Sequence, residues 1–252
     1  MNKLPQITLA FWVMKICATT LGETAGDLLS MTLDVGYAMS SLILISIFAA
    51  SLFGQLASKR YHPALYWFVI LSTSTAGTTM SDFMDRTLGL GYAAGSAILI
   101  AILLVIFTAW FWSEKSLSVS RITSRKGELF YWFAILFSNT LGTALGDFLA
   151  DDSGLGFMGG ALLVGSAIAI VVVLHYTTKL SSVMLFWIAF VLTRPFGATL
   201  GDVLTKPYAK GGLDFGTVGS SLGLLVILLV LVAAATAFNR KRESAFEQVA
   251  DS

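Results

Sequence analysis

The chain is short of cysteine, histidine and charged residues. Its one cysteine, Cys17, lies in an apolar run, which excludes an intrachain disulfide framework. Its two histidines sit near the ends of apolar segments, which argues against a zinc or copper site of thiolates and imidazoles. Charged residues make up 12% of the chain, whereas a soluble domain carries roughly a quarter. The deficit excludes a soluble globular protein, and the net charge of +1 indicates no nucleic-acid partner.

Apolar sequence fills the chain instead. Hydrophobic residues make up 56% of it, and the mean hydropathy is +0.80. We therefore expect an integral membrane protein whose surroundings are the lipid bilayer. The N-terminal apolar run follows a lysine, as in a signal peptide, but similar runs recur later in the chain, so we expect it to be retained.

One sequence unit occurs four times. Four segments align without gaps, and in each a Trp is followed ten residues later by Gly and fifteen residues later by Asp. The segments begin at Phe11, Tyr66, Tyr131 and Phe186, and their aspartates are Asp27, Asp82, Asp147 and Asp202. The starts are 55, 65 and 55 residues apart, so one offset of 120 maps the first pair onto the second. Two successive duplications would explain this spacing.

A second apolar run follows each aspartate after a short polar loop and begins at a glycine. Each run has about twenty residues, enough for a helix to cross a hydrocarbon core of about 30 Å. The pattern predicts an all-α polytopic membrane protein with eight transmembrane helices, in four parallel two-helix repeats. We expect one transmembrane domain (1–238), with repeats at about 5–58, 60–113, 125–178 and 180–238, and a short cytoplasmic tail (239–252).

Lysine and arginine are concentrated between the repeats and at the termini. Eleven lie there, whereas the loops inside the repeats hold only Arg86, Lys206 and Lys210. The positive-inside bias therefore places both termini in the cytoplasm and the aspartate end of each first helix outside. All four repeats then share one orientation, unlike the inverted repeats of many transporters.

The first unit, KICATTLGETAGD, carries a resemblance to a known family. With its FW start and T-x-G-E-T-x-G-D core, the chain resembles, through Phe238, bacterial uncharacterised membrane-anchored proteins built from a repeat of unknown function. The resemblance implies an eight-helix protein of the bacterial inner (cytoplasmic) membrane. It implies no activity, so function has to be inferred from the polar residues.

Polar side chains recur at the same three positions of the first helices, except that the middle position of the fourth is Ala198. The positions seven, eleven and fifteen residues after each Trp lie four apart, so they share a helix face and predict an interior polar path. The expected metal ligands on this path are Glu23, Asp27, Asp82, Asp147 and Asp202. The remaining path is expected to be lined by Thr19, Ser74, Thr78, Asn139 and Thr143, with countercharges from Lys15 and Arg194.

The acidic positions favour a positive ligand. Aspartates at helix C-termini oppose the macrodipole and repel one another when they converge, unless a cation joins them. Oxygen donors without thiolates or imidazoles favour a hard ion such as Mn²⁺, Mg²⁺ or Ca²⁺. Two structural readings stay open: the aspartates solvate helix ends, or Glu23 is a fixed partner of Lys15 or Arg194.

The leading hypothesis is a cation transporter, with a divalent metal such as Mn²⁺ as the favoured substrate and no further cofactor. The alternative is a non-transporting membrane sensor, scaffold or partner subunit. An enzyme is not expected, because the sequence has no His-rich cluster, nucleophile elbow or phosphate-binding loop. The sequence does not decide between a monomer and a homo-oligomer, or between a twofold and a fourfold arrangement of the polar columns.

Overall fold

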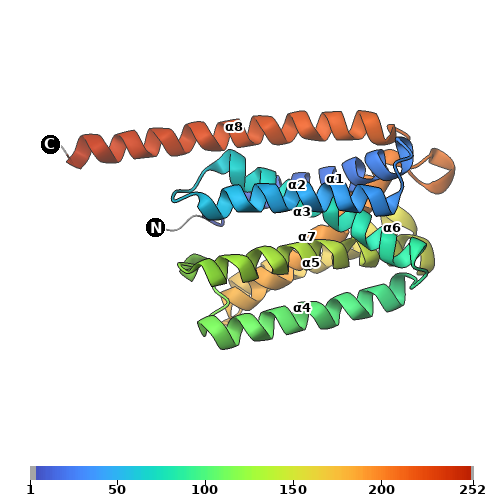
Figure 1. Ribbon diagram of the computed structural model, residues 1–252, viewed down its shortest axis with the longest axis horizontal. Helices are drawn as coiled ribbons and strands as arrows, with labels where there is room; N and C mark the ends of the chain where they lie inside the picture. Colours follow the sequence, from blue (N-terminus) through green and yellow to red (C-terminus); the bar gives the residue numbers. More distant parts are fainter. Residues whose placement is uncertain (1–3, 251–252) are drawn as a thin grey trace.

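The computed structural model describes the backbone of residues 4–250 and the side chains of residues 4–238. Within these residues the chain is helical and has no strand. The long helices are α1 (Leu9–Asp27), α2 (Tyr37–Ala57), α3 (Pro63–Asp82), α4 (Tyr92–Glu114), α5 (Arg125–Asp147), α6 (Gly156–Thr177), α7 (Ser182–Thr205) and α8 (Gly216–Ala250). The two ends of the chain lie toward the same end of the bundle (Figure 1). The predicted tail, 239–252, lies wholly outside the described side chains.

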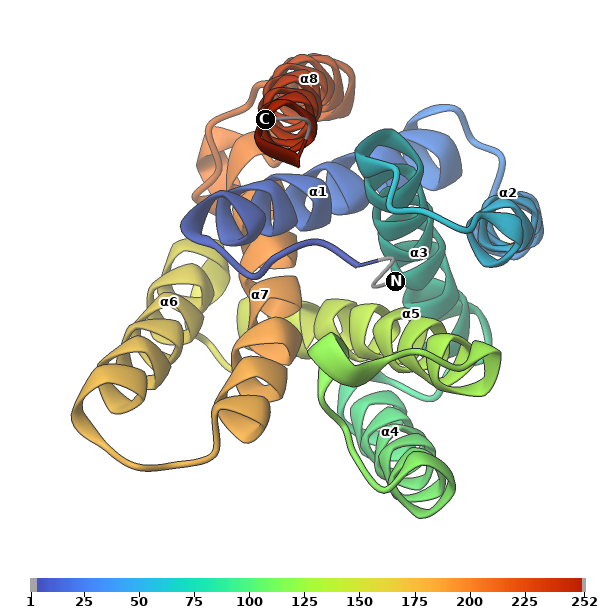
Figure 2. The same ribbon diagram turned by 90° about the vertical axis from the view of Figure 1, so that its left-hand side faces the viewer.

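The first helix of each repeat belongs to an inner ring. Helix α1 packs against α3 and α7, and α5 packs against the same two helices from the opposite side. The end view shows α1, α3, α5 and α7 surrounding a common axis (Figure 2). This arrangement is fourfold at the level of the helices, a point that the sequence left open.

The second helix of each repeat covers the outside of the ring. Helix α2 packs on α3, α4 on α5, α6 on α7 and α8 on α1, so each outer helix leans on the inner helix of the next repeat. Six of the eight helices are long and apolar enough to cross a membrane, and the remaining two are α1 and α3. These two fall short because they carry polar residues, which are buried inside the bundle.

Glycines allow the inner helices to touch. At each crossing, the glycine ten residues after the Trp faces the residue seven after the Trp of the next repeat. The four contacts are Gly22 with Ser74, Gly77 with Asn139, Gly142 with Arg194, and Gly197 with Thr19. The last contact joins the fourth repeat to the first, so the same small-residue packing closes the ring.

Replacing Gly77 with alanine is expected to destabilise the bundle by about 1–3 kcal/mol, because small-to-large changes at a tight contact force a shift. The new Cβ would lie 2.9 Å from the backbone nitrogen of Thr140, which cannot rotate away. The matched control is Gly54→Ala on α2, where the Cβ would be 3.8 Å from the Leu65 side chain. Thermal unfolding in detergent compares the two. Equal melting temperatures would contradict the close approach of α3 and α5.

The connections inside the repeats have a shared geometry. The four glycines at the start of the second helices have φ between 66° and 78°, a region that other residues rarely adopt. This explains why each second run begins at a glycine. The predicted short polar loops instead start as π-helical turns in three repeats, at Leu28–Thr32, Phe83–Thr87 and Phe148–Asp152. The wider turns continue the inner helices past their aspartates.

Candidate functional site

The four repeat aspartates converge at one end of the inner ring. Each lies at or near the C-terminal end of its inner helix, and each is at most 4% exposed. Basic side chains bridge these aspartates in pairs. The Nε of Arg86 lies 2.8 Å from Oδ1 of Asp82, and its Nη2 lies 3.1 Å from Oδ2 of Asp147. Arg86 therefore joins the aspartate of its own repeat to that of the next.

Lys206 makes the corresponding bridge on the other side of the ring. Its Nζ lies 3.1 Å from Oδ1 of Asp202 and 3.3 Å from Oδ2 of Asp27. An offset of 120 residues relates this trio to the trio around Arg86. The charged layer is therefore twofold, although the helix ring around it is fourfold.

The sequence pattern gave no role to these two bases, since both lie beyond the first helices. The available signal is their spacing, because each follows a repeat aspartate by four residues and thus shares its helix face. Burial by itself would lower the pKa of Lys206, but Asp202 and Asp27 raise it above its usual range. Asp82 and Asp147 raise the pKa of Arg86 against burial in the same way. Both bases stay cationic.

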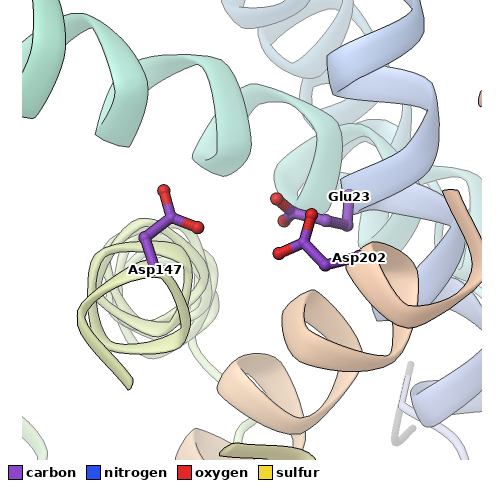
Figure 3. Close-up of side chains that lie close together, drawn as sticks. All are labelled: Glu23, Asp147 and Asp202. Atoms are coloured by element: carbon purple, nitrogen blue, oxygen red, sulfur yellow. The ribbon is translucent and has the colours of Figure 1, made fainter. Parts of the chain in front are cut away.

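A cavity of about 110 Å³ lies among these aspartates. The side chains of Arg86 and Lys206 are 34% and 26% exposed, so the cavity reaches the surface at this end. Figure 3 shows Glu23, Asp147 and Asp202 on three different inner helices, with one oxygen of each within 4.8 Å of the others. Ligands of one ion at about 2.1–2.6 Å are at most about 4.2–5.2 Å apart, so the spacing suits a shared cation.

The carboxylates around the cavity outnumber the bases. Six acidic residues line it: Glu23, Asp27, Asp82, Asp147, Asp151 and Asp202. Three bases, Arg86, Lys206 and Lys210, also line it, and Arg194 pairs with Glu23, so two negative charges remain when every carboxyl is ionised. In addition, Oδ1 of Asp27 is buried and has no hydrogen-bond partner. A buried carboxylate oxygen without a donor is costly. One divalent cation in the cavity would neutralise both charges.

Glu23 lies one turn deeper than the aspartates and is paired with Arg194. The Nη2 of Arg194 is 2.9 Å from Oε2 of Glu23, and the two side chains are 0% and 4% exposed. Of the two partners considered for Glu23, the structure therefore places Arg194 against it and not Lys15. The hydroxyls of Thr78 and Thr143 also lie within hydrogen-bond distance of the same Glu23 oxygen.

Lys15 is the deepest charged residue of the path. It is fully buried, and no carboxylate among residues 4–238 forms an ion pair with it. Its Nζ lies 3.4 Å from Oδ1 of Asn139 and 4.3 Å from the centroid of the Phe190 ring. In this conformation Lys15 is not in contact with any of the acidic residues for which it was expected to be a countercharge.

Aromatic residues fill the other end of the ring. The residues that precede each Trp in the repeats are Phe11, Tyr66, Tyr131 and Phe186. The hydroxyls of Tyr66 and Tyr131 are 2.6 Å apart, and both side chains are buried. Phe11 packs near Phe186, with ring centroids 6.4 Å apart. The axis therefore has a polar cavity at one end and an aromatic layer at the other.

Comparison with known families gives one match. The model described as "Repeat of Unknown Function (DUF347)" matches residues 10–61, 65–116, 130–181 and 185–241. The chain belongs to the DUF347 repeat family. The four matches confirm the four-copy repeat, and no curated protein or solved structure gives a significant match. Because the DUF347 description names no activity, the functional argument rests on the geometry of the site.

In this DUF347 protein, the expected path residues are all buried between the inner helices. Thr78 and Thr143 surround Glu23 and Arg194, whereas Asn139 contacts Lys15. Thr19 bonds backbone carbonyls, and the hydroxyl of Ser74 has no hydrogen-bond partner. The structure thus separates the expected metal ligands into an open aspartate layer and a deeper layer around Glu23.

Proposed function

We propose that this protein transports a divalent cation, such as Mn²⁺, across the bacterial cytoplasmic membrane. The observation that carries the proposal is the acidic cavity at one end of the inner ring. It gathers carboxylates from four helices, keeps two negative charges beyond its own bases, and holds a buried aspartate oxygen without a donor. Hard divalent cations prefer such all-oxygen surroundings.

In this proposal all eight helices cross the membrane. Helices α1 and α3 are the two less apolar helices, but their polar residues are inside the bundle and outer helices pack against them. The positive-inside bias then places both termini in the cytoplasm and the acidic cavity on the outside. A cation would enter from the outside through the opening beside Arg86 and Lys206.

Passage to the cytoplasm requires a second conformation. Below the cavity the axis is occupied by Arg194 and Lys15, and the aromatic layer closes it further on. Release on that side needs α3 and α5 to separate where Tyr66 meets Tyr131. When the cavity is empty, protons or the tethered cations Arg194 and Lys15 would balance the carboxylates.

The test is Mn²⁺ flux into liposomes that contain the purified protein and a trapped metal-sensitive dye. We expect saturable quenching that empty liposomes do not show, and competition from other divalent cations in excess. Calorimetry on the same preparation measures Mn²⁺ binding. Binding without flux would favour the alternative, a membrane sensor or partner subunit, and the absence of both would remove the cation hypothesis.

A further inference from the structure

Three oxygen-bearing side chains form a cage below the acidic cavity. Eleven residues after each Trp, the first three repeats carry Glu23, Thr78 and Thr143, whereas the fourth carries Ala198. One turn earlier on the fourth inner helix, Arg194 extends into the space between them. All four residues are buried, and Glu23 also lines the acidic cavity above the cage.

The terminal nitrogen of Arg194 is surrounded as a coordinated cation would be. Its Nη2 lies 2.9 Å from Oε2 of Glu23, 2.5 Å from Oγ1 of Thr78 and 2.6 Å from Oγ1 of Thr143. A fourth oxygen, the carbonyl of Ser74, is 3.5 Å away. A guanidinium nitrogen carries two hydrogens in one plane, so it has fewer donors than the oxygens gathered around it.

The threonine hydroxyls are oriented for a cation as well. Each lies within reach of Oε2 of Glu23, at 3.2 Å for Thr78 and 3.3 Å for Thr143, and can donate its proton there. Their lone pairs are then free to face the nitrogen of Arg194. The carboxylate therefore organises two further oxygen ligands around one central point.

The guanidinium itself fits the cage incompletely. Arginine usually binds a carboxylate through two parallel hydrogen bonds, but only Nη2 of Arg194 contacts Glu23. Its Nε is buried without any partner, and its Nη1 reaches only the carbonyl of Thr19, at 3.4 Å. A purely structural arginine would be expected to satisfy these donors.

The pair of Glu23, from the first repeat, and Arg194, from the fourth, has a neutral counterpart in the second and third repeats. The offset of 120 residues maps Glu23 onto Thr143 and Ser74 onto Arg194. The other half of the ring therefore has a serine and a threonine at the positions where this half has an arginine and a glutamate. The cage therefore contains a single charged pair, Glu23 and Arg194.

We propose that Glu23, Thr78 and Thr143 form a binding site for a monovalent metal cation, which the terminal nitrogen of Arg194 occupies in this conformation. The cage supplies one negative charge, which a single positive charge neutralises, whether from guanidinium, Na⁺ or K⁺. Its position on a transport path rests on the proposed function, whereas the binding itself does not. Displacement of Arg194 would then admit a cation from the acidic cavity.

The test removes the tethered cation and supplies a free one. Arg194→Gln keeps a long polar side chain but leaves Glu23 without a fixed charge. In choline buffer containing a chelator of divalent ions, added NaCl or KCl should raise the melting temperature of this variant. The expected rise is roughly 5–10 °C at 100 times the dissociation constant, and choline chloride at equal ionic strength should not produce it.

Two companion variants locate the effect. Glu23→Gln combined with Arg194→Gln balances the charge without a cation, so it should fold and show no response to Na⁺ or K⁺. Thr143→Val combined with Arg194→Gln removes one oxygen of the cage and should weaken the response. Wild type should not respond, because Arg194 fills the site.

Several results would overturn the proposal. One is that Na⁺ and K⁺ leave the melting temperature of Arg194→Gln unchanged. Glu23 would then take up a proton in this variant, or Arg194 would be only structural. Another is an equal response in the variant with Glu23→Gln. If Arg194→Gln folds only when Na⁺ or K⁺ is present, the binding site is supported. If it folds only when Glu23→Gln is added, whatever the salt, the binding site is refuted. No divalent ion and no flux enters this experiment, so its failure is separate from failure of the transport proposal.

Discussion

Replacing Asp202 with asparagine is expected to abolish Mn²⁺ uptake into liposomes and to weaken Mn²⁺ binding by at least about 100-fold. Asp202 is one of the three carboxylates whose oxygens lie within 4.8 Å of one another. An amide has the same shape but no charge, and it is a poorer ligand for a hard cation. Mutation of a residue that merely hydrogen-bonds a metal ligand typically weakens metal binding by about 10–100-fold. Loss of a ligand itself should weaken binding at least as much.

The matched control for this loss is Asp152→Asn. Asp152 is exposed at the end of a π-helical turn and does not line the cavity. It should therefore leave binding and uptake unchanged, within about twofold. If both variants lost uptake equally, or neither did, the acidic cavity would not be the place where the ion binds. Melting temperatures of both variants show whether the bundle has stayed intact.

Replacing Lys206 with glutamine is expected to tighten divalent cation binding by about 10–100-fold. The ammonium group lies 3.1 Å from Asp202 and 3.3 Å from Asp27, so it competes for the oxygens that would hold the ion. A unit positive charge about 5 Å from a divalent ion opposes binding by several kcal/mol at an effective dielectric constant near 20, and water in the cavity reduces this. A gain of affinity is informative because general damage to the fold would not produce one.

Lys210→Gln removes a positive charge of the same type at the mouth of the same cavity. Lys210 is exposed, so solvent screens its charge and the effect on binding should be below about threefold. Weaker binding in Lys206→Gln would show instead that Lys206 holds the aspartates in a structure that the ion needs. Equal gains in both variants would indicate a diffuse surface charge and not a defined site.

The sequence alone predicted the repeat, the helices and the side chains that meet in the interior. The reason is that each repeat has the same glycine and aspartate at the same spacing on one helix face, and this pattern leaves few ways to pack four copies. The buried layers at Glu23 and at Asp27 follow directly from it.

Other features depended on tertiary geometry. Arg86 and Lys206 belong to the site because the chain continues past Asp82 and Asp202 as further helical turns, whereas the sequence there suggested loops. The pairing of Glu23 with Arg194 requires α1 and α7 to be neighbours, which only closure of the ring provides.

The most direct test of the account is anomalous X-ray scattering from crystals of the wild-type protein soaked in MnCl₂. The account predicts a manganese peak inside the cavity, within about 2.6 Å of oxygens of Asp147 and Asp202. The same soak of Asp202→Asn crystals should show no such peak. Manganese found only at exposed loop carboxylates, with the cavity empty at saturating concentration, would contradict the proposal that these aspartates hold a transported cation.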